Sequence, residues 1–417
     1  MLQIVSTACI VVSGICAPSP TAPPIVGLSP ARLSTIDHVA RLGIDARGYA
    51  GMAVVVGRHG TIAWQRGYGS LTWGTGTPRV SVERTMYDLA SLTKVVATTA
   101  AVMVLYDEGK LRLDDRASRY LPELRTGARS TITIRQLLEH TSGLPAGRDL
   151  WRDARGPREA RRLVLSSPLV RQPGERQVYS DLGADVLGFV VEAVSGQPLD
   201  VFVERHIFRP LGMKSTMFRP SRALRSRIAP TERFAPRGRS LRGEVHDENA
   251  WALGGVAGHA GLFATASDLA IFAQMMLDGG IHNGARIVRD STIALFTTRV
   301  AGTRALGWDT CAGGASCGQH MSERAYGHTG FTGTSLWIDP DRDMFVIVLT
   351  NRIHELPDGS TPRGAILADV RADIADIAEL SVVDGGLAAE MPSRLRADRA
   401  IGWGVGSPLP ASAPGGR

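Results

Sequence analysis

The sequence Ser91-Leu-Thr-Lys94 opens a long apolar stretch, residues 95–106, that ends shortly before Gly109. That composition predicts a helix with Ser91 at its N-terminus, where unpaired backbone N–H groups favour a developing negative charge. A lysine three residues later lies on the same helical face, within reach of the serine hydroxyl. If burial lowers the pKa of Lys94, its amine can accept the serine proton. The spacing therefore makes Ser91 a candidate nucleophile and Lys94 its candidate base.

Ser-x-x-Lys is a short pattern and also fits a capped helix with a lysine that extends to solvent. The chain has only three lysines, at positions 94, 110 and 214. With ordinary serine usage, roughly 0.2 chance matches per chain are expected. The scarcity of lysine therefore strengthens the catalytic interpretation.

Tyr179-Ser-Asp181 is a second candidate, between the turn at residues 172–175 and an apolar helix predicted from Leu182. A tyrosine on such a loop can carry a proton between serine and leaving group if nearby cations lower its pKa. The alternative is a packed loop tyrosine followed by Asp181 as the cap of the helix. Taken alone, this motif favours the structural alternative.

The third candidate is Gly327-His-Thr-Gly330-Phe-Thr-Gly333, which leads directly into a predicted strand at residues 334–338. Small residues at a strand edge allow a substrate backbone to approach closely. The N–H of Phe331 could then face that of Ser91 as a second oxyanion donor. A plain glycine-rich turn before a strand is the alternative.

The wider pattern predicts an α+β fold with an antiparallel sheet, flanking helices and an inserted all-helical subdomain. Two β-hairpins are expected, at residues 52–64 and 334–349, near opposite ends of the chain. Helical periodicity at residues 33–42 and 365–380 places a helix beside each hairpin. We expect one domain at residues 31–380, a helical subdomain at roughly 110–300, and a loose Gly- and Pro-rich tail at 381–417.

The first 30 residues resemble an export segment followed by a proline-rich spacer. Residues 1–17 are uncharged and mostly apolar, although the usual basic start is missing. The stretch is short for a membrane span, and Cys16 follows Ile15, which is a poor context for lipidation. The expectation is an exported protein of the periplasm or cell envelope, with membrane attachment through the N-terminus left open.

Several other motifs carry weaker signals. Gly314-Ala-Ser-Cys-Gly318 matches a nucleophile elbow, but the flanking residues fit neither the strand before Ser316 nor the helix after it. Cys311 and Cys317 would form a disulfide in an exported protein and remain thiols in the cytosol; zinc binding with His320 and His328 is a third option that fits no common spacing. Two polar segments, residues 246–249 and 258–261, are equally compatible with pocket lining and with turn hydrogen bonds.

Composition excludes several classes of protein. Apolar residues make up 44% and charged residues 21% of the 417, which excludes collagen-like, coiled-coil and wholly disordered chains. The net charge is +7, yet positive and negative residues are interleaved and no basic stripe with spaced aromatics occurs. A nucleic-acid partner is therefore not expected.

In the order Ser-x-x-Lys, Tyr-x-Asp and His-Thr-Gly, the three candidates resemble the penicillin-recognising serine hydrolases. This superfamily includes class C β-lactamases, D-alanyl-D-alanine carboxypeptidases and family VIII carboxylesterases. The resemblance runs from about residue 32 to 380 and includes residues 132–144, 210–213 and 327–340. It implies a β-lactamase/transpeptidase-like fold and catalysis without a cofactor or metal.

Carried over to this sequence, the resemblance implies an acyl-enzyme on Ser91, with Lys94 as proton acceptor. Tyr179 would protonate the leaving group, and the N–H groups of Ser91 and Phe331 would form the oxyanion hole. The substrate would lie along Thr329 and Gly330 and near Asp181 and His328.

Two residues depart from the class C pattern. Asp181 stands where Asn is usual and His328 where Lys is usual. A neutral histidine holds a substrate carboxylate less firmly than lysine, and an ionised Asp181 would repel it and keep Lys94 protonated. Both changes argue against an efficient β-lactamase. The preferred hypothesis is a D-alanyl peptidase acting on a small molecule or peptidoglycan peptide; the alternatives are a small-acyl esterase and a non-catalytic binding protein for peptidoglycan fragments.

Overall fold

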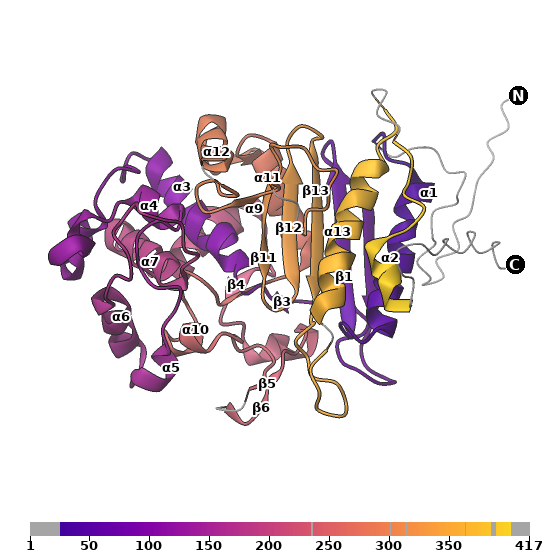
Figure 1. The fold of residues 1–417 in the computed structure, drawn as a ribbon, viewed down its shortest axis with the longest axis horizontal. Coiled ribbons are helices and arrows are strands. Elements are labelled where there is room, and N and C mark those ends of the chain that lie inside the picture. Colours follow the sequence, from indigo (N-terminus) through magenta and orange to yellow (C-terminus); the bar gives the residue numbers. More distant parts are fainter. Residues whose placement is uncertain are drawn as a thin grey trace, which may run out of the picture.

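A six-stranded antiparallel sheet forms the centre of the molecule, with the strand order β10-β11-β12-β13-β1-β2 (Figure 1). The computed structural model describes residues 26–234, 237–300, 302–312, 316–362, 364–384 and 389–401. The six strands are β1 (Gly51–Arg58), β2 (Thr61–Gly69), β10 (Asp309–Thr310), β11 (Tyr326–Gly330), β12 (Thr334–Asp339) and β13 (Met344–Thr350). The two predicted hairpins are therefore confirmed as β1–β2 and β12–β13.

Strands from the N-terminal and C-terminal parts of the chain pair with each other inside this sheet. Strand β1 pairs with β13 in a register that sets Met52 opposite Thr350 and Arg58 opposite Met344. Every residue of both strands is buried. Because side chains alternate across a strand, such complete burial requires a layer of helices on each face of the sheet.

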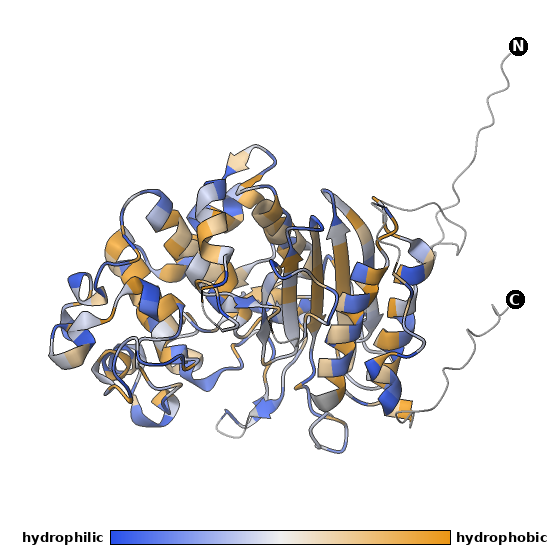
Figure 2. Cartoon of the chain, turned by 45° about the horizontal axis from the view of Figure 1, so that its top comes forward, coloured by the Kyte–Doolittle hydropathy of each residue, from blue (hydrophilic) through white to orange (hydrophobic). Residues whose placement is uncertain are grey.

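The first helical layer consists of α1 (Pro30–Leu33), α2 (Thr35–Asp45) and α13 (Gly364–Leu380). Apolar residues of α2 and α13 pack with Met52, Val54 and Val56 of β1 in one hydrophobic core. The predicted helix at residues 33–42 is divided at Ser34, which caps the end of α1 and precedes α2. In Figure 2 apolar and polar residues alternate along the helices of this layer, and the neighbouring strands are largely apolar.

The second layer covers the opposite face and carries the helix that follows Ser91. Ala53 and Val55 of β1 face this side and pack in a larger core with η1 (Lys94–Thr99), α3 (Ala100–Asp107), α7 (Asp181–Ser195) and α11 (Ala266–Leu277). The predicted helix at 95–106 is confirmed, but its first part, η1, is a π-helix. π-Helical turns are rare and often occur at functional sites.

The inserted region is mostly helical and also contains short strands. Its helices are η2 (Ala117–Arg119), η3 (Pro122–Leu124), η4 (Gly127–Thr131), α4 (Ile134–Leu138), α5 (Leu150–Asp153), α6 (Pro157–Ser166), α8 (Leu199–Val203), η5 (Glu204–Phe208), α9 (Arg209–Leu211), η6 (Arg222–Arg227), α10 (Glu248–Ala252) and α12 (Asp290–Thr297). Its strands are β4 (Met217–Phe218), β5 (Arg233–Phe234), β6 (Arg239–Ser240), β7 (Leu262–Ala264), β8 (Ile281–His282) and β9 (Ala285–Arg286). Strand β7 pairs with β3 (Tyr87–Asp88), directly before the Ser91 segment. The short strands thus link the insertion to the start of the candidate catalytic helix.

The C-terminal segment is more ordered than its composition predicts. Residues 389–401 include η8 (Arg396–Ile401), which packs on α2 and α13. Arg396 forms ion pairs of 2.9 Å with Asp373 and 2.7 Å with Asp376, and Asp398 contacts His38 at 2.9 Å. The expectation of a loose tail from residue 381 is therefore wrong for this segment, because specific ion pairs fix it. Of the predicted export segment and spacer at 1–30, residues 1–25 lie outside the described residues, as do residues 402–417 of the predicted tail.

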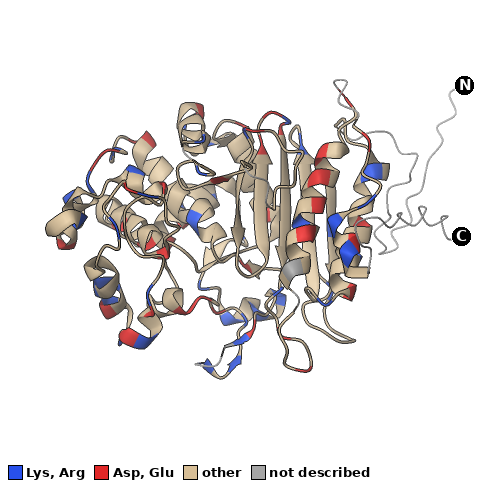
Figure 3. Cartoon of the chain, viewed as in Figure 1, with Lys and Arg blue, Asp and Glu red and all other residues tan. Residues whose placement is uncertain are grey.

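Charge is dispersed over the surface. In Figure 3 the basic and acidic residues lie side by side over much of the visible face, with acidic residues along α13. Within the described residues no single helix is long and apolar enough to cross a membrane; one bent pair, α7 with Leu199–Leu211, meets the length and composition criteria across a 70° bend. Cys311 and Cys317 are joined in a disulfide.

Candidate active site

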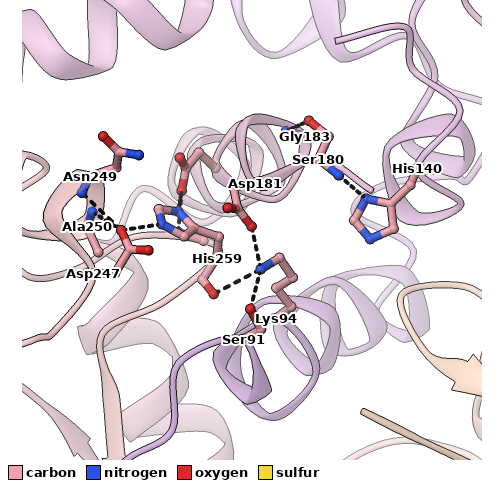
Figure 4. Close-up of polar contacts among 12 residues, drawn as sticks. Ser91, Lys94, His140, Ser180, Asp181, Gly183, Asp247, Asn249, Ala250 and His259 are labelled. Carbon is pink, nitrogen blue, oxygen red and sulfur yellow. Dashed lines mark hydrogen bonds and ion pairs between the residues drawn. The ribbon is translucent and has the colours of Figure 1, made fainter. Parts of the chain in front are cut away.

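Ser91 and Lys94 are in direct contact at the start of the π-helical turn (Figure 4). Lys94 Nζ donates to Ser91 Oγ at 3.0 Å and to the carbonyl oxygen of His259 at 3.3 Å. The same nitrogen lies 2.7 Å from Asp181 Oδ1. The lysine is only 3% exposed, so these three oxygens replace the water that would otherwise solvate its charge. The i,i+3 contact predicted from the sequence is thus present.

The surroundings of Lys94 keep it protonated. Burial by itself lowers the pKa of Lys94, but interactions with Tyr179 and Asp181 outweigh burial, and the pKa is raised above its usual value. The lysine is therefore an ammonium at neutral pH, as expected from an aspartate at position 181. It can take up the serine proton only if it gives one of its own protons to a neighbour.

A strained turn sets the position of Ser91. Ala90, the preceding residue, has φ +46, a left-handed conformation that costs a non-glycine residue free energy. The buried carboxylate of Asp88 stabilises this turn, because it accepts the N–H of Ala90 at 2.9 Å and that of His246 at 2.7 Å. The backbone before Ser91 is therefore held by Asp88, which also ties it to the segment at His246.

The turn between β11 and β12 docks onto the same segment. Thr332 Oγ1 donates to the carbonyl oxygen of Asp88 at 2.6 Å, and Thr334 Oγ1 donates to that of Leu89 at 2.9 Å. Within the described residues, neither the Ser91 N–H nor the Phe331 N–H donates a hydrogen bond to the protein. Two fixed backbone N–H groups without protein acceptors are what an oxyanion hole requires.

Tyr179 lies beside two cations. Lys94 Nζ is 4.8 Å and the Arg304 guanidinium 5.1 Å from the centre of its ring. The rings of His140 and His328 lie 4.7 Å and 5.9 Å away. The tyrosine thus meets Lys94, as predicted, and its surroundings are more strongly cationic than the sequence indicated.

The helix cap after Tyr179 differs from the prediction. Ser180 is the N-cap of α7, and its Oγ accepts the N–H of Gly183 at 3.0 Å. Asp181 is the first residue of the helix and directs its carboxylate to Lys94 instead. The alternative of Asp181 as a cap is therefore wrong, because the neighbouring serine satisfies the helix terminus.

His328 is buried rather than presented at the surface. It is 2% exposed, and Nδ1 lies 2.7 Å from the carbonyl oxygen of Thr329. Burial, with Arg304 and Lys94 nearby, lowers the pKa of His328 to about 3, so the ring is neutral at pH 7. Arg304, which forms a 3.0 Å ion pair with Asp309, is the cation at this end of the site, and no sequence motif identified it.

A second cluster next to Lys94 joins the two polar segments identified in the sequence to Asp185, a partner that the sequence did not indicate. His259 contacts Asp185 through Nδ1 at 2.7 Å and Asp247 through Nε2 at 2.9 Å. Asp247 also caps α10, where its Oδ1 accepts the N–H groups of Asn249 and Ala250. The two polar segments at 246–249 and 258–261 thus serve as turn and cap and also meet at the site. Acidic residues at i and i+4 on the apolar helix α7, Asp181 and Asp185, were the available signal.

The remaining candidates are Ser316, the zinc-ligand residues and the substrate-binding residues Thr329 and Gly330. Ser316 accepts a hydrogen bond from Trp337 Nε1 at 3.0 Å and is followed by turns, not a helix. Among the described residues, no group of three or more His, Cys, Asp or Glu side chains is arranged to hold a metal ion. Of the substrate-binding candidates, Thr329 is half-buried, and Gly330 packs against Leu89 and Thr334.

Fold and site together define the class of protein: a serine hydrolase with a Ser-x-x-Lys helix between a sheet and a helical region. The Beta-lactamase family model matches residues 36–370, and the chain belongs to this family.

Individual relatives support the same class. An Escherichia coli K12 protein named "Putative D-alanyl-D-alanine carboxypeptidase" is 34% identical over 373 residues, which cover 80% of this chain and 85% of that protein. EstCE1, described as a hydrolase with promiscuous acyltransferase activity, is 26% identical with a TM-score of 0.66 and covers 83% of this chain and 98% of its own. A penicillin-binding protein homologue from Caulobacter crescentus shares the fold, with a TM-score of 0.68, 18% identity, and coverage of 85% and 99%.

Proposed function

We propose that this chain cleaves D-alanyl peptides through an acyl-enzyme on Ser91. The observation that carries the proposal is the placement of Lys94 Nζ, 3.0 Å from Ser91 Oγ and 2.7 Å from Asp181. This chain of contacts gives the serine proton a path to a carboxylate. The names of the carboxypeptidase-like relatives favour a D-alanyl substrate. Such peptides occur in bacterial cell walls, so the proposal includes an exported, envelope-associated protein.

Acylation in this proposal is a relay. Ser91 Oγ attacks the substrate carbonyl carbon while its proton passes to Lys94, and Lys94 passes one of its own protons to Asp181. The oxyanion accepts the N–H groups of Ser91 and Phe331. The C–N bond then breaks as Tyr179 protonates the leaving amine, and the proton held by Asp181 returns through Lys94 to Tyr179. A water molecule hydrolyses the ester by the same proton path and regenerates Ser91.

A peptide substrate has a terminal carboxylate that needs a cationic partner. His328 is neutral and buried, and so does not supply that charge. Arg304 lies against Tyr179, and its Nη1 is a buried donor without a hydrogen-bond acceptor among the described residues. We assign Arg304 the role of attracting the carboxylate, because a guanidinium with a free N–H binds carboxylates well.

A second candidate function is hydrolysis of small-acyl esters. Two observations favour it: position 328 carries no charge, and Phe331 beside the serine is 59% exposed, an apolar surface for an acyl chain. The similarity to EstCE1 supports this alternative.

Release of D-alanine from a peptide ending in D-alanyl-D-alanine tests the proposal against this alternative. The matched substrate is the same peptide with a C-terminal amide, and p-nitrophenyl butyrate reports esterase activity. We expect kcat/KM for the peptide with a free carboxylate to exceed that for the C-terminal amide by about tenfold or more. Arg304→Gln should remove that preference. Rapid ester turnover with no D-alanine release, in an enzyme that depends on Ser91, would reject the peptidase in favour of the esterase.

A further inference from the structure

His259 lies between η1, α7 and the start of α10, because it contacts Lys94, Asp185 and Asp247. Its backbone carbonyl accepts a proton of Lys94 Nζ at 3.3 Å, whereas its side chain points the other way, into a pair of carboxylates (Figure 4). The residue is 1% exposed, so its side chain is closed to solvent. It therefore acts on the site only through what it holds in place.

Both ring nitrogens of His259 face carboxylates, and this fixes the charge of the ring. Nδ1 lies 2.7 Å from Asp185 and Nε2 2.9 Å from Asp247, an arrangement in which a protonated ring donates to both carboxylates. Burial alone would lower the pKa of His259, but the two carboxylates raise it well above its usual value. Asp181 is the third acid that raises the pKa of His259. Tyr179 and Asp181 raise the pKa of Lys94.

The backbone around His259 has no room to relax. A Cβ at Gly258 would overlap the carbonyl oxygen of Ala184 on α7. The N–H of Gly258 donates to Asp185 at 3.0 Å, and its carbonyl accepts Thr98 Oγ1 at 2.6 Å from the turn after Lys94. The segment is thus fixed both to α7, which carries Asp181, and to η1, which carries Lys94.

We propose that His259, clamped between Asp185 and Asp247, is a positioning residue that sets Lys94 between Ser91 and Asp181. The imidazolium joins α7 to α10 and aims its own carbonyl oxygen at the lysine ammonium. It also supplies a positive charge between Asp185 and Asp247, the two carboxylates that flank the proton relay. This inference rests on the proposed function of Lys94 and Asp181 as that relay.

Two charge-removing variants test the inference, because they act in opposite directions. His259→Gln removes a positive charge and raises the proton affinity of the relay, so the rising limb of kcat/KM against pH should move to higher pH, by about one unit. Asp247→Asn removes a negative charge and keeps the oxygen that caps α10, so the same limb should move to lower pH. The assay is p-nitrophenyl butyrate hydrolysis between about pH 5 and 9.

The kinetic constants separate positioning from general damage. For His259→Gln we expect kcat/KM to fall about 10²-fold through kcat, with KM little changed, because the residue contacts no substrate. His38→Gln is the matched control: it breaks another histidine–aspartate contact of 2.9 Å, on the other face of the sheet, and should leave both constants and the pH profile unchanged. Equal pH profiles in all three variants would overturn the inference. Shifts of the same sign in His259→Gln and Asp247→Asn would also overturn it.

Failure of the inference can be told apart from failure of the proposed function. If Ser91→Ala is inactive while the His259 and Asp247 variants keep the wild-type profile, only the positioning role is wrong. If Ser91→Ala keeps full turnover, the proposed function is wrong as well. Should His259→Gln not fold, the acid shift expected of Asp247→Asn decides the question on its own.

Discussion

Asp181 Oδ1 lies 2.7 Å from Nζ of Lys94, and that nitrogen also donates to Ser91 Oγ at 3.0 Å. The lysine therefore joins the hydroxyl of Ser91 to a carboxylate. In the proposed relay this carboxylate is the final acceptor of the serine proton, so the proposed mechanism does not require a neutral lysine at neutral pH.

Asp181→Asn should expose this dependence. An amide cannot accept the relayed proton, so Lys94 must lose its own proton before it can act as the base. We expect kcat/KM at pH 7 to fall by about 10²-fold and then to rise with pH as the lysine is deprotonated. A pH series of ester hydrolysis checks this, and a flat profile near the wild-type rate would refute the relay.

Tyr179→Phe should distinguish substrates by their leaving groups. An amine needs a proton to leave, whereas p-nitrophenolate leaves without one. We expect D-alanine release to fall by about 10³-fold and nitrophenyl ester turnover by about tenfold or less. Comparing the two assays on one preparation gives the ratio, and equal losses would mean that Tyr179 does not protonate the leaving group.

Gly330→Ala should disturb the turn between β11 and β12, which carries Phe331. The added methyl group would overlap the carbonyl oxygen of Leu89 and the hydroxyl of Thr334, both of which dock this turn against the serine segment. We expect about 1–3 kcal/mol of destabilisation and a clear loss of kcat. Gly147→Ala is the control, because its Cβ would meet nothing within 4 Å. Chemical denaturation and ester turnover measure the two effects, and a neutral Gly330→Ala would contradict the described packing.

Glu379 makes stability depend on pH. Burial and the nearby carboxylate of Asp339 raise the pKa of Glu379 from 4.5 to about 9. Between these values the folded protein keeps a proton that the unfolded chain releases, so the free energy of unfolding falls as the pH rises, by up to about 1.4 kcal/mol per unit. Glu379→Gln should flatten this slope and stabilise the protein at pH 8 more than at pH 5. Melting curves at both pH values test this, and Glu123→Gln, at an exposed position, is the control. The same dependence of unfolding free energy on pH in wild type and Glu379→Gln would contradict the prediction.

The parts of the fold and site that are local in sequence were predictable. Both hairpins follow from short β-rich runs separated by turn residues, and the Ser91–Lys94 contact follows from i,i+3 spacing on one helix. Tyr179 was identified by its order in the chain relative to two other motifs. In the hairpins and the Ser91–Lys94 pair, one element brings the contacting residues together, whereas Tyr179 reaches Lys94 from a distant segment.

The parts that depend on distant residues were not predictable. His259 meets Asp185 across 74 positions, and no pattern in either segment specifies the partner. Arg304 lies in a loop without a motif and reaches Tyr179 only through the tertiary fold. The ordered segment at 389–401 has a disordered-type composition, yet ion pairs with α13 hold it. The composition of residues 389–401 does not predict their contacts, because those contacts depend on the side chains of α13.

The central claim, that Ser91 is acylated, is tested most directly by intact-protein mass spectrometry. Wild type and Ser91→Ala are exposed briefly to benzylpenicillin and, separately, to a p-nitrophenyl ester. We expect a mass gain equal to the acyl group in wild type with at least one reagent and none in Ser91→Ala. A gain of the same size in Ser91→Ala, or its full ester turnover, would contradict the assignment of the site.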